Sequence, residues 1–300
     1  MSPSAAAESA NLRAALLILA SSTLFGIGDA IVKYLSEDWP VGQIVTLRSA
    51  VCLMLLGLVR PKREPLVPRG LLQRTNLVRG GFEIGVTFLF FSGLMFMPLG
   101  NAVSIMFLAP ILLTALAALL LGEQVGWRRW TAVLVGFAGV LVVVRPGLEG
   151  WNAAALLPLG AACFIAGRDI VVRWLPPEVT TRTVVVTTSA GLFLAGAVTL
   201  PFAWEPLGWK LVLGCVVCGA TVTSAFHLYV QATRVAEVSF LQPFKYVAIP
   251  LSFVIGFVVW GDVPSPRALL GVALIAASGL FIFHRGRRLR RSAQAGDGQG

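Results

Sequence analysis

Charged side chains are scarce in this chain. Aspartate, glutamate, lysine and arginine make up 13% of its 300 residues, whereas 57% of the residues are apolar. A soluble domain carries about 25% charged residues, so there is too little charge here to cover a water-exposed surface. The apolar excess also excludes intrinsic disorder, and four cysteines are too few for a disulfide scaffold. The composition therefore indicates a membrane protein.

Several chemical motifs are missing as well. The sequence has no Gly-x-x-x-x-Gly-Lys-Ser/Thr segment, which excludes an ATP-driven pump of the P-loop type. Its two histidines are His227, within an apolar run, and His284, in the basic C-terminal segment. Cys215-x-x-Cys218 also lies in an apolar run, where we favour buried packing over a redox or zinc role. We expect no metal site and no cofactor. An integral-membrane enzyme is the alternative, but it needs histidine and carboxylates gathered at one membrane face.

Apolar runs long enough to cross a bilayer recur from Leu12 to Phe283. At about 20 residues per helix, they predict an all-α polytopic membrane protein with ten transmembrane helices and short loops. All eight tryptophans fall at or beside a predicted span end, the interfacial position that indole prefers. The predicted spans are 12–34, 41–59, 75–97, 100–121, 130–144, 151–173, 182–202, 208–232, 238–260 and 267–284.

Lysine and arginine gather next to the span ends. With both termini in the cytoplasm, 17 of these residues lie in the inner loops, tails and adjoining span ends, three in the outer loops and adjoining span ends, and the remaining four within the spans. By the positive-inside rule this asymmetry predicts that topology. The net charge of +10 is then explained by contact with anionic lipid. We expect the bilayer as a partner, and no nucleic acid, because no soluble basic domain accompanies these charges.

The chain is similar to itself at an offset of 140 residues. The segment 29–35, Asp-Ala-Ile-Val-Lys-Tyr-Leu, lies over 169–175, Asp-Ile-Val-Val-Arg-Trp-Leu, and Pro110 lies over Pro250. Each half has five spans, an odd number, so the second half must enter the membrane from the opposite side. We predict two inverted five-helix repeats, at 12–145 and 151–284, between an N-terminal tail at 1–11 and a basic tail at 285–300. Carriers use such repeats for alternating access; a duplicated scaffold without transport is the alternative.

Short motifs recur at matching places in the two halves. The first half has Asp29-x-x-x-Lys33, Gln43-x-x-x-x-Arg48, Ala109-Pro110 and Leu121-Gly-Glu123, and the second has Leu241-Gln-Pro-Phe-Lys-Tyr246, Pro250 and Gly261-Asp262. In these motifs the chain resembles the EamA-type transporters of the drug/metabolite transporter superfamily, over nearly all of 12–284. One departure is Gly-Asp after the ninth helix, where the family has Gly-Glu.

The motifs look most like the branch that contains bacterial riboflavin and S-adenosylmethionine importers, while amino-acid exporters belong to the same superfamily. The resemblance implies a secondary transporter of a small organic metabolite, amino-acid-like, vitamin or nucleoside-like, in the bacterial inner membrane. It does not determine the direction of transport. From the residues we expect a proton- or gradient-driven carrier that is a monomer or a homodimer.

Besides the basic residues counted with the loops and tails, seven charged residues lie inside predicted spans, where a charge facing lipid costs about 2.5–3.5 kcal/mol. We therefore expect these side chains to face partners or water inside the bundle. Asp29 and Lys33 are four residues apart, as are Arg79 and Glu83, so local ion pairs compete with a role in substrate binding. The seven residues are Asp29, Lys33, Arg48, Glu83, Arg168, Asp169 and Lys245.

The eighth span carries a polar stripe that the sequence predicts to face the bundle interior. Its residues are Thr221, Ser224, His227, Gln231 and Arg234. Because imidazole titrates near neutral pH, His227 is the candidate for proton coupling, although a lone interior histidine is more often a packing group.

The ninth span places Lys245 and Tyr246 just before Pro250, which frees a backbone carbonyl and allows a kink. A buried lysine there suits an anionic substrate group, unless it pairs with Glu83 or Asp29. We predict hinges at Pro110 and Pro250 and a central site between the repeats. The predicted substrate-binding residues are Asp29, Arg48, Glu83, Arg168, His227, Lys245 and Tyr246.

Overall fold

The computed structural model describes residues 3–59, 68–121, 127–144, 153–235, 241 and 244–297. Within these ranges the chain is helical, with no β-strand. The helices are α1 (Pro3–Leu35), α2 (Val41–Leu58), α3 (Arg74–Leu94), α4 (Leu99–Met106), α5 (Ala109–Leu121), α6 (Trp127–Val144), α7 (Leu156–Val172), α8 (Thr181–Thr199), α9 (Trp209–Val235), α11 (Ala248–Trp260) and α12 (Pro266–Asp297), with a short 3-10 turn, η1 (Ala153–Ala155), before α7.

The helices are those of a polytopic membrane protein. Over the described residues, seven helical stretches are long and apolar enough to cross a bilayer, and Trp130–Val143, Ala248–Trp260 and Pro266–Phe281 are shorter apolar helices. These ten stretches correspond to the ten predicted spans. The basic segment predicted as a tail at 285–300 continues α12 as far as Asp297. Arginine, alanine and glutamine have favourable helix propensity, which explains this extension.

Two of the spans are broken, at the same place in each half. The fourth consists of α4 and α5, separated at Phe107 and Leu108, and the amide groups of Ile111 and Leu112 both donate to the Leu108 carbonyl. In the ninth, α11 begins at Ala248 after a turn at residues 246–247. Pro110 and Pro250 both lie in the first turn of the helix after the break, where the missing proline N–H costs little. Their role as hinges stays a prediction.

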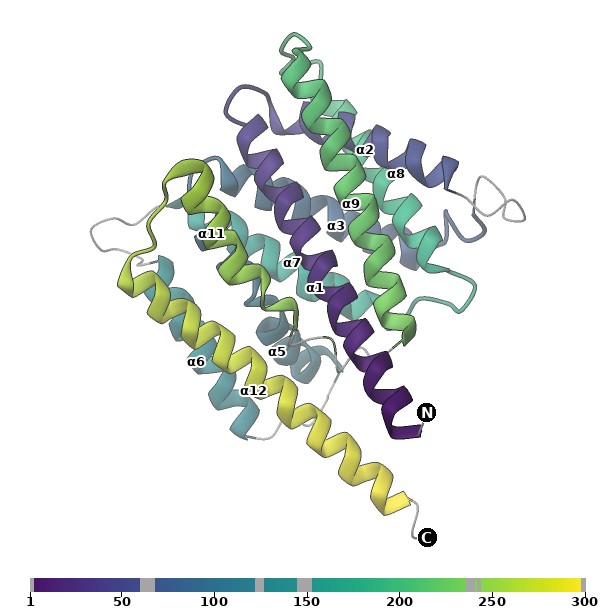
Figure 1. Ribbon diagram of the computed structural model, residues 1–300, viewed down its shortest axis with the longest axis vertical. Helices are drawn as coiled ribbons and strands as arrows, with labels where there is room; N and C mark the ends of the chain where they lie inside the picture. The colour runs from purple at the N-terminus through teal and green to yellow at the C-terminus, as the bar shows by residue number, and fades with distance from the viewer. Residues whose placement is uncertain are drawn as a thin grey trace.

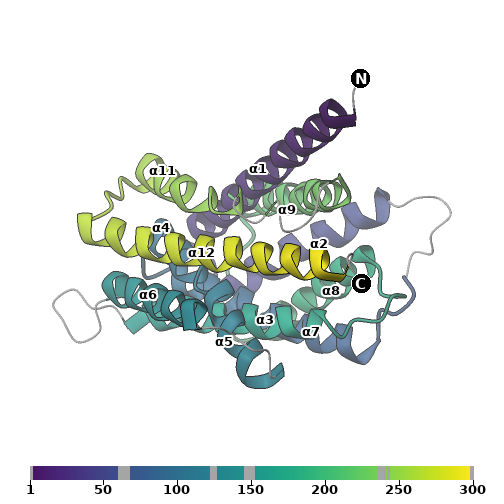
Figure 2. The same ribbon diagram turned by 90° about the horizontal axis from the view of Figure 1, so that it is seen from below.

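The two halves exchange helices reciprocally. The first helix of each half packs on the third of the other, as α1 on α9 and α7 on α3. The second helices pair as α2 with α8, the fourth as α4 with α11, and the fifth as α6 with α12. Figures 1 and 2 show α6 and α12 side by side, and α1 beginning at the end of the bundle where α12 finishes. We call this the termini end, and the opposite one the far end. This pairing fits two inverted repeats, whereas the predicted boundaries at 145 and 151 lie outside the described residues.

Polar side chains reinforce this exchange at both ends. At the far end, the Gln43 amide on α2 donates to the Glu205 carbonyl over 2.8 Å and accepts from the Glu205 N–H over 3.0 Å, which ties down the loop before α9. At the termini end, Thr183 on α8 donates to the Arg69 carbonyl and ties down the loop before α3. Gln43 and Thr183 are 140 residues apart, so the second helix of each half holds the loop before the third helix of the other.

Glycine allows α6 and α12 to approach closely. A Cβ atom added at Gly139 would lie 2.8 Å from the Gly271 carbonyl oxygen, and one added at Gly271 would lie 2.6 Å from that of Gly139. Only a residue without a side chain fits at either position, as in other membrane helix pairs.

Candidate functional site

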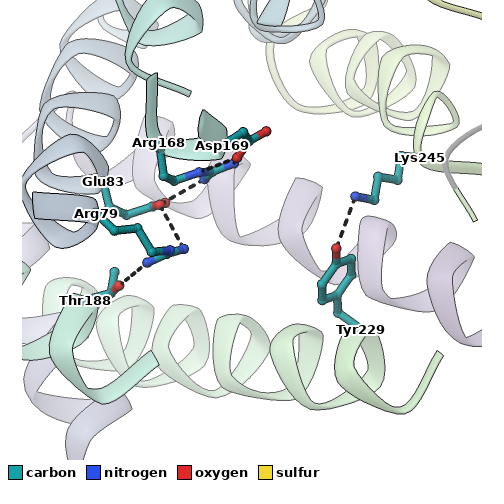
Figure 3. Close-up of polar contacts among 7 residues, drawn as sticks. All are labelled: Arg79, Glu83, Arg168, Asp169, Thr188, Tyr229 and Lys245. Atoms are coloured by element: carbon teal, nitrogen blue, oxygen red, sulfur yellow. Dashed lines mark hydrogen bonds and ion pairs between the residues drawn. The ribbon is translucent and has the colours of Figure 1, made fainter. Parts of the chain in front are cut away.

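Four charged side chains form a cluster between the two halves. Arg168 on α7 contacts Glu83 on α3, with 2.9 Å between Nη1 and Oε2, and its Nη2 lies 2.9 Å from Oδ1 of Asp169. Arg79, one turn before Glu83, lies 3.6 Å from the same carboxylate and donates to the Thr188 hydroxyl on α8 over 2.8 Å. Figure 3 shows this chain of contacts from α8 through α3 to α7. We call these four charged residues the 79–169 cluster.

The packing of α3 on α7 explains why the cluster forms. Glu83 and Arg79 share one face of α3, and that face meets Arg168 on α7. The side chains of Arg79, Glu83 and Arg168 are only 12–23% exposed, so each charge needs a partner. Two arginines and two carboxylates make the cluster electrically neutral. The local pair of Glu83 with Arg79 is therefore present, beside a pair with Arg168 that the sequence did not predict, and the role of these residues in substrate binding stays a prediction.

Arg48 on α2 is the most deeply buried basic side chain of the predicted site. It is 8% exposed, and its guanidinium carbon lies 4.6 Å from the centroid of the Phe91 ring. Its Nε is buried and has no hydrogen-bond partner among the residues that the structure describes. Asp29 on α1 interacts electrostatically with Arg48, and among the described residues neither takes part in an ion pair within 4 Å. Arg48 is thus a buried cation with one donor unsatisfied among the described residues.

Lys33 does not pair with Asp29, although the spacing allowed it. Its Nζ donates to the carbonyls of Met97, over 2.7 Å, and Leu94, over 3.3 Å, at the end of α3. It also lies 5.1 Å from the ring centroid of Trp260, whose indole N–H donates to Glu37 over 2.6 Å. Carbonyls at a helix C-terminus carry partial negative charge and so attract a cation. We call Lys33, Glu37 and Trp260 the far-end latch, because they join α1 and the turn after it to the end of α3 and to α11.

Lys245 contacts an aromatic ring. Its Nζ lies 3.4 Å from the Tyr229 hydroxyl and 4.8 Å from the centroid of that ring, as Figure 3 shows. Among the residues with described side chains, Lys245 has no carboxylate within 4 Å, so the pairing with Glu83 or Asp29 is not formed. Tyr246 packs beside Phe107, with 4.9 Å between ring centroids, and its buried hydroxyl has no hydrogen-bond partner.

His227 lies elsewhere, and the prediction that its stripe faces the interior is wrong for three of the five residues. Ser224, His227 and Arg234 are exposed on α9, and the His227 ring is hydrogen-bonded to the Gln231 amide over 2.7 Å. His227 lines a groove of about 590 Å³ between α9, the end of α2 and the start of α8. None of the other predicted binding residues lines that groove. Helical spacing showed that the stripe shares one face, but only the packing decides which way the face points.

Sequence reasoning missed Tyr229, Phe91 and Thr188 as parts of the site. Tyr229 and Phe91 are aromatic residues in apolar spans, where nothing separates them from ordinary packing residues. Thr188 had a usable signal, because it lies 140 residues after Arg48 and so occupies the matching place in the second half.

Comparison with known proteins identifies the family. The model of the EamA-like transporter family matches residues 12–145. The "Riboflavin transporter" of Vibrio cholerae is 30% identical over 289 residues, which cover 90% of this chain and 93% of that protein. The chain belongs to the EamA-like transporter family.

Other relatives of this EamA-like transporter carry different names. The "S-adenosylmethionine uptake transporter" of Rickettsia felis is 25% identical over 64% of this chain and 65% of that protein. The "Pseudopaline exporter CntI" of Pseudomonas aeruginosa is 27% identical over 88% of this chain and 93% of that protein. A crystal structure with 22% identity aligns with a TM-score of 0.55 over 95% of this chain and 99% of that one, which shows the fold. This EamA-like transporter is thus a multi-pass membrane transport protein.

Proposed function

We propose that this EamA-like transporter is a gradient-driven secondary carrier that moves a small organic metabolite across the bacterial inner membrane by alternating access. The observation that carries the proposal is the 79–169 cluster, because it places half-buried charges between the two halves. Charges shared by two halves have different partners when the halves move, so they can couple movement to ligand or proton binding. Membership of a transporter family supports transport over the alternative of a membrane enzyme.

The chemistry of the site favours a planar substrate rich in hydrogen-bond acceptors. Arg48 and Lys245 each lie over an aromatic ring, and Arg48 and Tyr246 keep unused donors. Among the embedded ionisable residues, basic side chains outnumber acidic ones, which disfavours a cationic substrate such as S-adenosylmethionine. The V. cholerae relative is named for riboflavin, a heteroaromatic vitamin with carbonyl acceptors. Riboflavin is therefore the first substrate to test.

The far-end latch supports alternating access between unequal ends. At an offset of 140, the counterparts of Glu37 and Trp260 are Pro177 and Leu120, which can form neither an indole–carboxylate bond nor a cation–ring contact. The latch therefore joins helices at one end by contacts that Pro177 and Leu120 cannot make at the other. We propose that the far end faces outward, with both termini in the cytoplasm, and that the latch breaks when the outward-open state forms.

Purified protein in liposomes tests the function. We expect riboflavin to be taken up faster than into empty liposomes, with a rate that responds to an imposed pH gradient. Loading the liposomes with riboflavin and following efflux determines the direction, since the relative named a pseudopaline exporter makes export the second candidate. A Glu83→Gln variant should abolish flux, and an exposed control, Arg267→Gln, should not. Flux equal to that of empty liposomes in both directions, across vitamins, nucleosides and amino acids, would contradict a carrier.

A further inference from the structure

One exposed face of α9 changes character along the helix. The first half of the face exposes four apolar residues, Val212, Leu213, Val216 and Val217. Steps of three and four residues continue the same face into a polar part, Ser224, His227, Gln231 and Arg234. An exposed apolar face on a membrane helix is suited to contact with acyl chains, and the polar residues continue it toward the termini end, where α9 finishes.

The groove that His227 lines is built for an amphiphile. Its apolar walls come from the end of α2, the start of α8 and α9. The basic residues of the lining are Arg182 and Arg234, and no aspartate or glutamate is among the lining residues. The apolar lining residues are Leu56, Val59, Val185, Phe226, Leu228 and Val230. An apolar groove whose charged lining residues are all basic suits a ligand with a hydrocarbon part and an anionic group.

The depth of these groups fits a phospholipid. Arg182 is the second residue of α8 and Arg234 the last but one of α9, so both lie at the termini end. His227 precedes Arg234 by seven residues, about 10 Å along the helix at 1.5 Å per residue. This spacing places His227 deeper in the membrane than a phosphate held by Arg234, on the side of the glycerol esters and acyl chains. Free phosphate could use only the arginines and would leave the apolar walls unfilled.

We propose that the groove between α2, α8 and α9 is a binding site for an anionic phospholipid of the surrounding bilayer. Arg182 and Arg234 hold the phosphate, and the hydrogen-bonded pair of His227 and Gln231 lies at the level of the ester carbonyls. One acyl chain lies along the apolar face from Val217 toward Val212. This site goes beyond the proposed function, since it does not depend on which metabolite the carrier moves.

Native mass spectrometry of the detergent-solubilised protein tests the proposal with phosphatidylglycerol and phosphatidylcholine of the same acyl chains. We expect the wild type to bind phosphatidylglycerol more tightly, and the double variant Arg182→Gln with Arg234→Gln to lose about 30-fold in affinity for it, from two basic contacts. The matched control is Lys210→Gln with Arg267→Gln, which removes two exposed positive charges at the far end and should bind like the wild type. Unchanged thermal melting of both double variants shows that they fold.

Further arms separate lipid from the other occupants. Val230→Trp fills the groove and should weaken phosphatidylglycerol binding while both arginines remain. Glycerol phosphate, which has the anion without the chains, should not displace the lipid. Equal losses in the two double variants, or displacement by glycerol phosphate, would overturn the proposal. So would a Ser224→Cys variant that forms a disulfide between two copies in membranes, because a second copy would then cover the groove.

Discussion

Arg168 on α7 and Glu83 on α3 belong to different halves of the chain, and 2.9 Å separates their side chains. They are 85 residues apart in sequence. Glu83 also forms an ion pair with Arg79, and Arg168 forms one with Asp169. Each residue of the central pair therefore has a second partner within its own helix. The contact between the halves can therefore break without leaving either charge isolated, which is what a moving carrier needs.

The central pair should be coupled in stability. We expect Glu83→Gln and Arg168→Gln each to lower the free energy of unfolding by about 1.5–3 kcal/mol, the range for a hydrogen bond to a charged group. Thermal or denaturant unfolding in detergent measures this, and a double-mutant cycle isolates the pair. The double variant should lose less than the sum of the single losses. Additive losses would show that the two side chains act independently.

Lys245 should contribute to substrate binding more than to stability. Lys245→Ala removes its charge, and we expect transport affinity to fall by about 10- to 100-fold if a charged hydrogen bond to substrate is lost. Lys245→Arg should retain much of the affinity. Tyr229→Phe is the matched control, because it keeps the ring beneath the cation and removes only the hydroxyl. Saturation curves of riboflavin uptake measure all three, and an unchanged KM in Lys245→Ala would remove this residue from the site.

Breaking the far-end latch should open the far end more often. Glu37→Ala with Trp260→Ala removes the indole–carboxylate bond and the ring beneath Lys33. A cysteine at Asn101, close to the end of α11, reports access when the exposed Cys163 is first replaced by serine. We expect a membrane-impermeant thiol reagent to label Asn101→Cys several-fold faster when the latch is broken. Labelling of the same cysteine by reagent added on the termini side should slow, because the far end and the termini end are not open at the same time.

The prolines after the two breaks should affect turnover rather than affinity. Pro250→Ala supplies an N–H that can bond to the Tyr246 carbonyl and straighten the helix across the break. We expect the maximal transport rate to fall while KM and melting temperature stay close to the wild type. Pro110→Ala should behave alike if the halves are equivalent, and Pro98→Ala, outside either break, provides the comparison. A wild-type rate in both variants would argue against hinges at these positions.

Much of the fold followed from local sequence. The apolar runs predicted ten spans, and the offset of 140 matched Pro110 with Pro250, which lie just after corresponding breaks. The contacts within the candidate site were predicted less well from the sequence. Glu83 and Arg168 do contact each other, but Lys33 bonds to the carbonyls of Leu94 and Met97, and spacing along one helix carries no information about the end of another.

The sequence by itself determined that this chain lies in a membrane, how many times its apolar runs can cross it, and to which transporter family it belongs. These properties follow from the hydropathy and motifs of the individual segments, because each segment must be long and apolar enough by itself to cross a bilayer. Only the tertiary structure decided the rotation of each helix, because neighbours from the other half determine which face is buried. For that reason Arg48 lies in the interior over Phe91, while His227, also within an apolar run, lies exposed on α9.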